Sequence, residues 1–244
     1  MSAQTIVLTG ASGGIGRALT EYFLENKLTN LVCQYKTHDE ALFEVLREHG
    51  LDTQRHSFHA DLTDENEVHQ FGEFTRKNFG QPWAVINLAG ASTNAMSWKL
   101  AKDEFIRIMQ SNLLTTFLTS KEFIPGMREA NGGRLINISS VVAFTGIAGA
   151  SHYAAAKAAI IGLTKSMAQE LSSKNITANA LALGYFDYGL IKDVPETMLN
   201  EIKARVPLKR LGLANEIGGM IRFLISDDGA FTTGQVLHIN GGLY

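Results

Sequence analysis

The chain has 244 residues, and 45% of them are hydrophobic, so it can bury a sizeable core. Its formal net charge is −2, with basic and acidic residues interspersed, which argues against a nucleic-acid partner. No apolar run reaches the roughly 18 residues of a transmembrane helix, and the first residues lack the features of a signal peptide, so we expect a cytoplasmic protein.

Cysteine and histidine indicate neither a disulfide nor a metal site. The single cysteine, Cys33, lies in an apolar run and is predicted to be a core residue. The 7 histidines lack the spacing of metal ligands, since His56 and His59 would point to opposite faces of an extended strand. We therefore expect no bound metal.

A glycine-rich loop follows the first predicted strand. Residues 5–9 form a β-rich run and residues 17–26 an amphipathic segment, which predicts strand, loop and helix. Glycines let the loop approach a pyrophosphate closely while the first N–H groups of the helix face the phosphates; the alternative is a plain tight turn. The position between strand and helix favours a dinucleotide site, formed by Gly10, Ser12, Gly13, Gly14, Ile15 and Gly16.

The second predicted strand, residues 30–35, decides which dinucleotide is expected. It ends without a carboxylate to accept a ribose 2′-hydroxyl, and Lys36 follows. Lys36 could neutralise a 2′-phosphate, so NADP(H) is favoured over NAD(H). Asp39 and Glu40 lie close by and weaken this prediction, and a solvated lysine at the strand end is the alternative.

Predicted elements continue through the middle of the chain. They are a helix at 41–49, an extended segment at 54–60, a helix ending at 79, a strand at 83–88, and helices at 103–111 and 113–128. Asp61 follows the extended segment and could accept a bond from an adenine amino group, while Thr63 and Asp64 could cap the next helix.

Two further polar positions lie at or after the fourth predicted strand. That strand closes in Asn87, followed by Ala89 and Gly90, whose small size would let the cofactor ribose lie against the backbone. Asn112 joins the two helices and either holds a bound water or satisfies a helix bend.

The alternation of strands and helices runs to the end of the chain. A strand at 134–139, a helix at 153–171, a strand at 176–183, a helix at 215–225 and a strand at 235–240 are predicted. Residues 185–206 have mixed character and would suit a lid over a substrate. This order predicts an α/β fold, with residues 1–244 forming one Rossmann-like domain whose doubly wound parallel sheet has helices on both faces.

Tyr153 and Lys157 are the candidate catalytic pair. They lie four residues apart on a predicted helix, so phenol and ammonium share one face. A free phenol titrates near pH ~10, and an adjacent cation lowers that pKa, which would make Tyr153 a general acid. Ser140 follows a buried strand and could bond the same substrate oxygen. An ordinary surface pair is the alternative reading, and His152 is a weaker candidate base.

Four motifs together resemble the short-chain dehydrogenase/reductase family from residue 5 to residue 242. They are Thr9-Gly10 with Gly14 and Gly16; Asn87-Leu88-Ala89-Gly90; Ser140 with Tyr153 and Lys157; and Asn112. The resemblance implies that Tyr153 donates a proton to a ketone oxygen that Ser140 steadies. It implies further that Lys157 holds the nicotinamide ribose and lowers the Tyr153 pKa, and that Asn112 positions a relay water.

The resemblance also implies a cofactor, a substrate and an assembly. NADPH is the expected hydride donor, and Leu62 and Phe186 join the expected cofactor-binding residues. The likeness favours the 3-oxoacyl-acyl-carrier-protein reductases, so we expect a 3-oxoacyl thioester of fatty acid biosynthesis, with a free or differently carried ketone close behind. A homotetramer is expected from the same likeness.

Several positions depart from the family pattern. Gly13 stands where many NADPH-using relatives carry a basic residue, while Leu183 and Tyr188 replace the usual Pro and Thr, so we expect a reshaped nicotinamide pocket. Asn131 replaces a basic carrier-docking residue, whereas Lys174 keeps another. Two alternative functions remain: an NAD-linked dehydrogenase of a small alcohol or sugar, and a dinucleotide-binding sensor without turnover.

Overall fold

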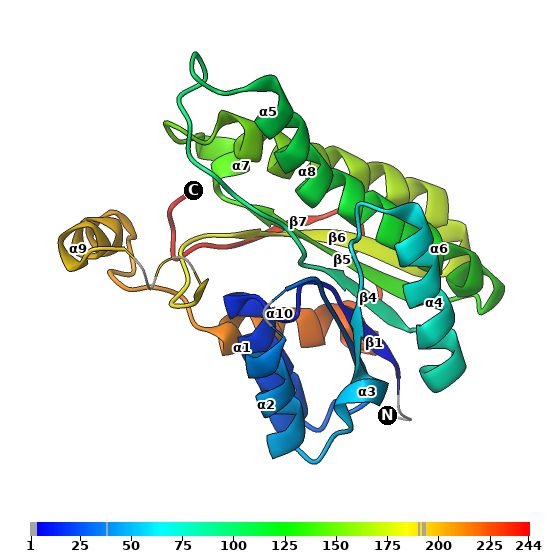
Figure 1. Cartoon of the computed structure of the whole chain (residues 1–244). Coiled ribbons are helices and arrows are strands. Elements are labelled where there is room, and N and C mark those ends of the chain that lie inside the picture. The colour runs from blue at the N-terminus through cyan, green and yellow to red at the C-terminus, as the bar shows by residue number, and fades with distance from the viewer. Residues whose placement is uncertain (1–3, 38, 190, 192–193) are drawn as a thin grey trace.

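The computed structural model describes residues 4–37, 39–189, 191 and 194–244. Within these residues the strands form one 7-stranded parallel sheet in the order β3-β2-β1-β4-β5-β6-β7 (Figure 1). The strands are β1 (Ile6–Leu8), β2 (Leu31–Tyr35), β3 (Ser57–His59), β4 (Ala84–Asn87), β5 (Gly133–Ser140), β6 (Ile176–Leu183) and β7 (Val236–Ile239). The predicted doubly wound, Rossmann-like sheet is confirmed.

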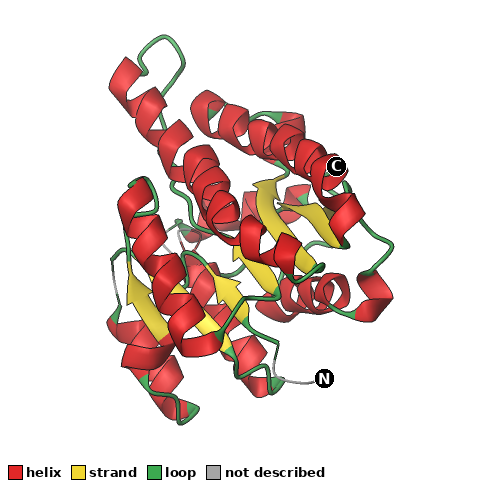
Figure 2. Ribbon diagram, turned by 90° about the vertical axis from the view of Figure 1, so that its right-hand side faces the viewer, coloured by secondary structure: helices red, strands yellow, loops and turns green. Residues whose placement is uncertain are grey.

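Helices cover both faces of the sheet (Figures 1 and 2). One layer holds α1 (Gly14–Glu25), α2 (Glu40–Glu48) and α10 (Ala214–Ile225); the other holds α4 (Glu65–Phe79), α6 (Thr115–Glu129) and α8 (Ser151–Leu171). Side chains alternate along a strand, so Ile6 and Leu8 pack under the first layer and Val7 under the second. The inner strands β1, β4, β5 and β6 are thereby buried on both faces, as their near-continuous apolar sequences require, whereas the edge strands β3 and β7 are partly exposed.

The smaller elements include the main differences from prediction. They are α3 (Thr53–His56), α5 (Lys102–Met109), the π-helical turn η1 (Gln110–Leu114), α7 (Val142–Thr145), η2 (Ser172–Lys174), α9 (Glu196–Arg205) and η4 (Asp227–Gly229). The predicted extended segment is wrong for residues 54–56, because the Asp52 side chain accepts a hydrogen bond from the Gln54 N–H and starts the helical turn α3. At 64, the predicted cap is present, since the Asp64 carboxylate accepts from the N–H groups of Asn66 and Glu67.

The two helices predicted around Asn112 are joined by η1, so α5 and α6 run on through one widened turn. Cys33 is buried, as expected. In the described part of the chain, none of the helices combines the length and apolarity that crossing a membrane demands.

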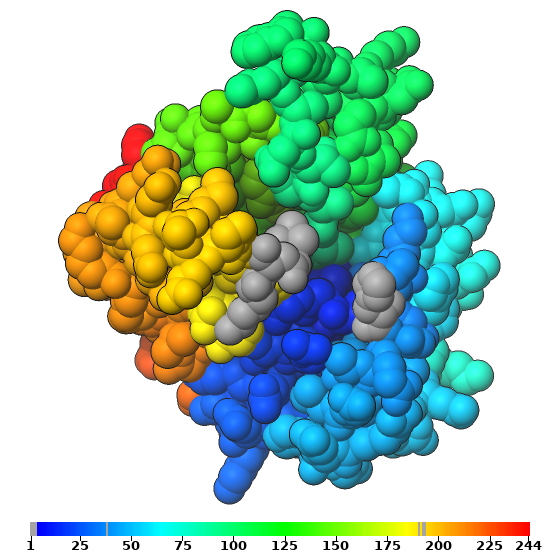
Figure 3. Space-filling model, turned by 60° about the vertical axis from the view of Figure 1, so that its left-hand side comes forward, coloured from blue at the N-terminus to red at the C-terminus, as the bar shows by residue number. Residues whose placement is uncertain are grey.

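The proposed lid segment, 185–206, leaves the end of β6 and contains α9, none of whose residues is buried. Residues 190, 192 and 193 of this segment lie outside the described residues. Figure 3 shows its yellow and orange surface beside the dark blue surface of the N-terminal residues. The two regions touch, because a Cβ added to Gly14 would overlap the backbone of Gly189. The segment therefore reaches the glycine-rich loop at the carboxyl ends of the strands.

Candidate active site

The glycine-rich loop packs tightly against its neighbours. Gly10 has a φ of +65°, and a Cβ there would lie 2.8 Å from the Ala89 Cα atom at the end of β4. A Cβ on Gly16 would overlap the Gly10 carbonyl oxygen. The loop can therefore cross the strand ends and turn into α1 only because both positions are glycine.

The N-terminus of α1 is suited to an anion. Its cap residue, Gly13, makes no side-chain cap, and the first turn of the helix carries no acidic residue. The backbone N–H groups of this turn thus keep their positive potential, which favours a phosphate. The observed loop and helix fit the pyrophosphate of the predicted dinucleotide.

Two buried polar residues that were not among the predicted site residues hold this loop in place. The Gln34 Oε1 atom accepts from the Gly10 N–H at 2.9 Å, and its Nε2 donates to the Ala60 carbonyl at 2.6 Å. The Thr9 Oγ1 atom accepts from the N–H groups of Leu88 and Ala89 at 3.0 and 3.1 Å. The available signal was a glutamine inside the apolar strand LVCQY, since a buried amide requires partners.

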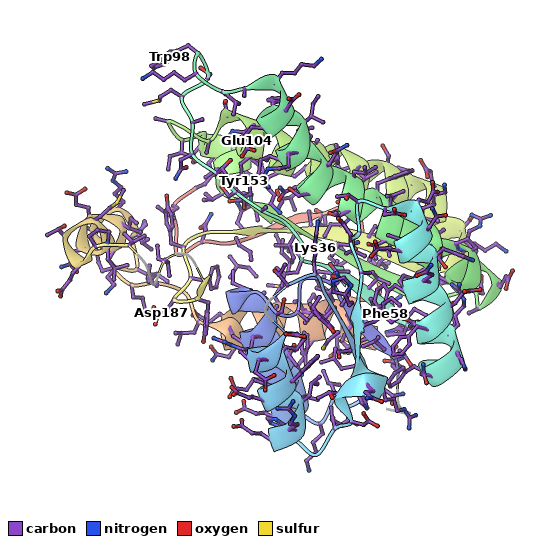
Figure 4. The ribbon with its side chains drawn as sticks, in the orientation of Figure 1. Lys36, Phe58, Trp98, Glu104, Tyr153 and Asp187 are labelled. Atoms are coloured by element: carbon purple, nitrogen blue, oxygen red, sulfur yellow. The ribbon has the colours of Figure 1, made fainter. Side chains whose placement is uncertain are left out.

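Lys36 and Asp61 meet at the ends of β2 and β3. The Lys36 Nζ atom lies 2.5 Å from an Asp61 carboxylate oxygen, and the other oxygen accepts from the Thr63 N–H and hydroxyl (Figure 4 labels Lys36). Burial alone would raise the pKa of Asp61, but these hydrogen bonds and the Lys36 charge lower it. The structure brings together two predicted cofactor residues, and it pairs Lys36 with a carboxylate.

Ser140 and Tyr153 are brought together from β5 and α8. Ser140 is the last residue of β5 and Tyr153 lies in the first turn of α8, and the Ser140 hydroxyl lies close enough to the phenol to oppose the rise of the Tyr153 pKa on burial. The neighbouring Ser139 instead donates to the Lys157 carbonyl at 2.8 Å, a contact inside the core. The strand end therefore presents one serine to the phenol and uses the other to fix α8.

Lys157 is buried beside Tyr153, and its ammonium group is directed elsewhere than expected. Its Nζ atom donates to the Ile138 carbonyl at 2.9 Å and lies 5.6 Å from the centroid of the Tyr153 ring. Burial lowers the pKa of Lys157 to about 8. Burial also raises the pKa of Tyr153, against a smaller lowering by the Ser140 hydrogen bond, so the expected net lowering is wrong for this structure.

Asn112 presents an unpaired acceptor close to Lys157. Its Nδ2 atom donates to the carbonyl groups of Ala91 and Ile108 at 2.8 and 2.9 Å. Its buried Oδ1 has no partner among the described residues. A Cβ on Gly90 would overlap this Oδ1 and lie 3.5 Å from the Lys157 Nζ. Glycine at 90 is thus required for the Asn112 Oδ1 to lie where it does, on the side of Gly90 that also faces the Lys157 ammonium.

The other predicted cofactor residues lie around this edge. Asn87 is buried at the end of β4, where its Nδ2 donates to Asn137 and Ser120. The side chains of Leu62 and Phe186 belong to the two hydrophobic cores, and Phe186 also lines a cavity beside β7. Ser12 donates to the Thr37 carbonyl at 2.6 Å and ties the glycine-rich loop to the end of β2.

Comparison with known proteins agrees with this arrangement. A family model described as enoyl-(acyl carrier protein) reductase matches residues 10–244. Proteins named 3-oxoacyl-[acyl-carrier-protein] reductase FabG are similar over their full length. The one from Pseudomonas aeruginosa is 35% identical, with 100% of this chain and 98% of the relative covered. The Escherichia coli K12 protein is 34% identical, covering 98% and 96%, and the Thermotoga maritima protein 31% identical, covering 100% and 98%.

Proposed function

The chain belongs to the short-chain dehydrogenase/reductase family and is an oxidoreductase acting on a keto or hydroxyl group, and on this premise we propose that it reduces a 3-oxoacyl thioester to the 3-hydroxyacyl product with NADPH. The observation that carries the proposal is that Ser140, Tyr153 and the buried Lys157 come together at the carboxyl edge of the sheet, where the Lys157 Nζ lies 5.6 Å from the centroid of the Tyr153 ring. Such an edge is where α/β sheets bind their ligands.

Tyr153 is the proton donor in this proposal. When bound, the dinucleotide supplies a hydride to the carbonyl carbon of the substrate. Burial raises the pKa of Tyr153, so its phenol is protonated at neutral pH and is an acid ready to protonate the oxygen. Ser140 donates a second hydrogen bond to the same oxygen and stabilises the charge that develops there.

Lys157 and Asn112 restore the proton. After transfer, the Tyr153 phenolate is stabilised by the Lys157 ammonium, which lies against the ring. A water held by the unpaired Asn112 Oδ1 would connect the ammonium to solvent. Lys157 also has donors left for the nicotinamide ribose, since its Nζ makes one hydrogen bond within the described part of the chain, to the Ile138 carbonyl.

The cofactor side supports NADPH through Lys36. The N-terminus of α1 and the glycine-rich loop would hold the pyrophosphate, and the Asp61 carboxylate would accept from the adenine amino group. Lys36 is the cation at the end of β2 that would pair with a 2′-phosphate. In the structure it is paired with Asp61, so the phosphate would compete with that carboxylate.

An acyl carrier is the proposed bearer of the substrate. The relatives' names specify a 3-oxoacyl group on such a carrier. Residues 185–206 are the proposed lid, because they leave β6 beside Ser140 and reach the glycine-rich loop.

A second copy of this chain is the proposed partner of an apolar face on α5, η1, α6 and α8. A groove of about 490 Å³ lies there, lined by Phe105, Ile106, Met109, Gln110, Leu113, Leu114, Phe117, Ala159 and Leu163. Of these side chains, Phe105, Ile106 and Phe117 are about 40% exposed to solvent. A contiguous patch of exposed large apolar side chains is typical of a surface that binds a protein. We place the contact of a homotetramer on this face, in line with the family resemblance.

The test is a panel of keto substrates assayed with NADPH and with NADH at equal concentration. The proposal predicts reduction of acetoacetyl thioesters, faster with NADPH, and faster for carrier-bound than for free substrate. Preference for NADH, together with oxidation of a small alcohol or sugar by NAD+, would favour a dehydrogenase instead. Dinucleotide binding without turnover of any substrate in the panel would favour a sensor.

A further inference from the structure

A buried histidine beside Tyr153 begins a chain of polar contacts that the reaction described above does not use. The His152 ring is buried, and its Nε2 lies 3.0 Å from the Thr93 Oγ1. The Thr93 hydroxyl donates to a Glu104 oxygen at 2.5 Å, and Arg107 binds both Glu104 oxygens at 2.7 Å. Figure 4 shows Glu104 and Tyr153 on the same side of the molecule, with Trp98 at the outer tip of the loop between β4 and α5.

The direction of these bonds fixes the state of the imidazole. Glu104 is ionised at neutral pH, because hydrogen bonds from Arg107 and Thr93 lower its pKa to about 2. Thr93 has one hydroxyl proton, and it donates this proton to the carboxylate. Thr93 can therefore only accept from His152, so the Nε2 atom carries a proton. The Nδ1 atom is buried without a partner among the described residues.

The contacts fasten a loop that has no regular structure of its own. Residues 88–101, between β4 and α5, contain neither helix nor strand. Among the contacts that tie the loop down are the Asn112 amide to the Ala91 carbonyl, His152 to Thr93, and the Ala95 N–H to the Gly149 carbonyl at 2.8 Å. Asn112 lies in η1, His152 lies in the first turn of α8, and Gly149 lies just before α8. The loop is therefore held by the two elements that carry Asn112, Tyr153 and Lys157.

We propose that His152 is a positioning residue, whose Nε2–H bond to Thr93 sets the place of this loop relative to the Tyr153 phenol. The buried His152 Nδ1 has no partner among the described residues, and an unpaired buried acceptor costs stability. A positioning role would explain why a histidine nevertheless occupies this place. The bond joins the first turn of α8, which carries Tyr153, to the middle of this loop, so its loss displaces the residues around Thr93 relative to the phenol. The Leu88–Ala89 end, which lies against the glycine-rich loop, stays in place because Thr9 holds it. This inference rests on the proposed function.

The kinetic test compares His152→Leu, His152→Gln and Thr93→Val. Glutamine can place a donor N–H close to the imidazole Nε2–H, whereas leucine cannot. Because misplacing reacting groups costs rate steeply, we expect His152→Leu to lower kcat/KM for the keto substrate by about tenfold or more. The dissociation constant of NADPH stays unchanged, and His152→Gln restores kcat/KM to within about threefold of the parent, since it keeps the donor.

Thr93→Val separates positioning from simple packing. It removes the bond to Glu104 as well as the bond to His152, so it is expected to lower kcat/KM at least as much as His152→Leu. The double variant is expected to be no worse than Thr93→Val alone, because the His152 bond is already lost in that variant. In the Thr93→Val background, His152→Gln should then fail to restore kcat/KM. The exposed imidazole of His69, on α4, provides the control, and His69→Leu leaves the kinetics unchanged. Equal kcat/KM for the parent, His152→Leu and Thr93→Val would overturn the proposal.

A second readout does not depend on turnover. Nitrogen NMR of the imidazole at neutral pH is expected to show a proton on the His152 Nε2, whose signal moves in Thr93→Val. A neutral ring with its proton on Nδ1 would overturn the proposal even if His152→Leu failed to fold. If the parent protein reduced no 3-oxoacyl thioester, the proposed function would fall, while this measurement would still decide whether the His152–Thr93 bond exists.

Discussion

Lys157 is a cation that the fold buries, and its pKa of about 8 lies below the ordinary value of 10.5. Because kcat/KM for the dinucleotide reports the free enzyme, we predict that it falls as pH rises through about 8 and the ammonium loses its proton. The unfolded chain binds the extra proton between these two pKa values, so this group's contribution to the free energy of unfolding rises with pH over that interval. Initial rates at saturating keto substrate, measured from neutral to alkaline pH, provide the check; a level profile across the Lys157 pKa would contradict the assignment.

Lys36 carries the expected preference for NADPH. We predict that Lys36→Ala raises the KM of NADPH about tenfold, because a charge-assisted bond to the 2′-phosphate contributes roughly 1.5–3 kcal/mol and the Asp61 pairing offsets part of it. The KM of NADH stays the same. Steady-state titration of both cofactors makes the measurement.

The matched control for Lys36→Ala is Lys77→Ala. Lys77 is exposed in the last turn of α4, so its loss should change neither KM. If Lys36→Ala weakened NADPH and NADH equally, Lys36 would not distinguish the two cofactors.

At the scale of elements, the junction of β1 and α1 requires glycine at position 16 as well as at position 10. We predict that Gly16→Ala lowers the free energy of unfolding by about 1–3 kcal/mol, because the added methyl overlaps the Gly10 carbonyl. Gly13→Ala is the control: its φ of −67° suits any residue, and the nearest atom to its Cβ lies 3.4 Å away. Denaturant unfolding of both variants compares them.

Gly13→Ala has two opposing effects on stability. Alanine makes the unfolded chain less flexible, which stabilises the protein, but it is a poorer helix N-cap than glycine, which destabilises it. The free energy of unfolding should therefore change by no more than about 1 kcal/mol. Gly16→Ala must therefore be the more damaging of the two. Equal stability of both variants would mean that the loop can relax away from α1.

Elements with a clear apolar period were predictable from the sequence. The strands β2 and β6 lie within one residue of their predicted bounds, and α8 begins two residues before its predicted start. The turn α3 was missed because a single Asp52 side chain creates it within a stretch that has no helical period. The π-helical form of η1 was also beyond a pattern of residue types, which fixes no hydrogen-bond register.

In the site, too, local contacts were predictable from the sequence, whereas contacts between distant residues were not. Spacing along one helix predicted that Tyr153 and Lys157 share a face, because that contact is local. The net rise of the Tyr153 pKa was not predictable, since it depends on burial by several elements and on the direction of the Lys157 ammonium. The bonds of Gln34 to the glycine-rich loop and of His152 to Thr93 join residues far apart in sequence, so spacing gives no sign of them.

At the scale of the whole molecule, the apolar groove on α5, α6 and α8 sets the expected assembly. We predict that the parent protein is a tetramer and that Phe117→Glu yields a smaller species, because a buried unpaired carboxylate at a subunit contact is costly. Sedimentation velocity distinguishes the two. Gln70→Glu, which adds the same charge to an exposed position of α4, should leave the assembly intact. A monomeric parent protein would remove the role assigned to this face.

The central claim is that the Tyr153 phenol protonates the carbonyl oxygen while hydride reaches the adjoining carbon. Its most direct test is a single turnover of enzyme-bound NADPH with an acetoacetyl thioester, followed by nicotinamide absorbance, in the parent protein and in Tyr153→Phe. We predict that the variant binds NADPH with unchanged affinity and transfers hydride about 10²–10⁴ times more slowly, the range expected for loss of a general acid. Hydride transfer at the parent rate in Tyr153→Phe would contradict the claim.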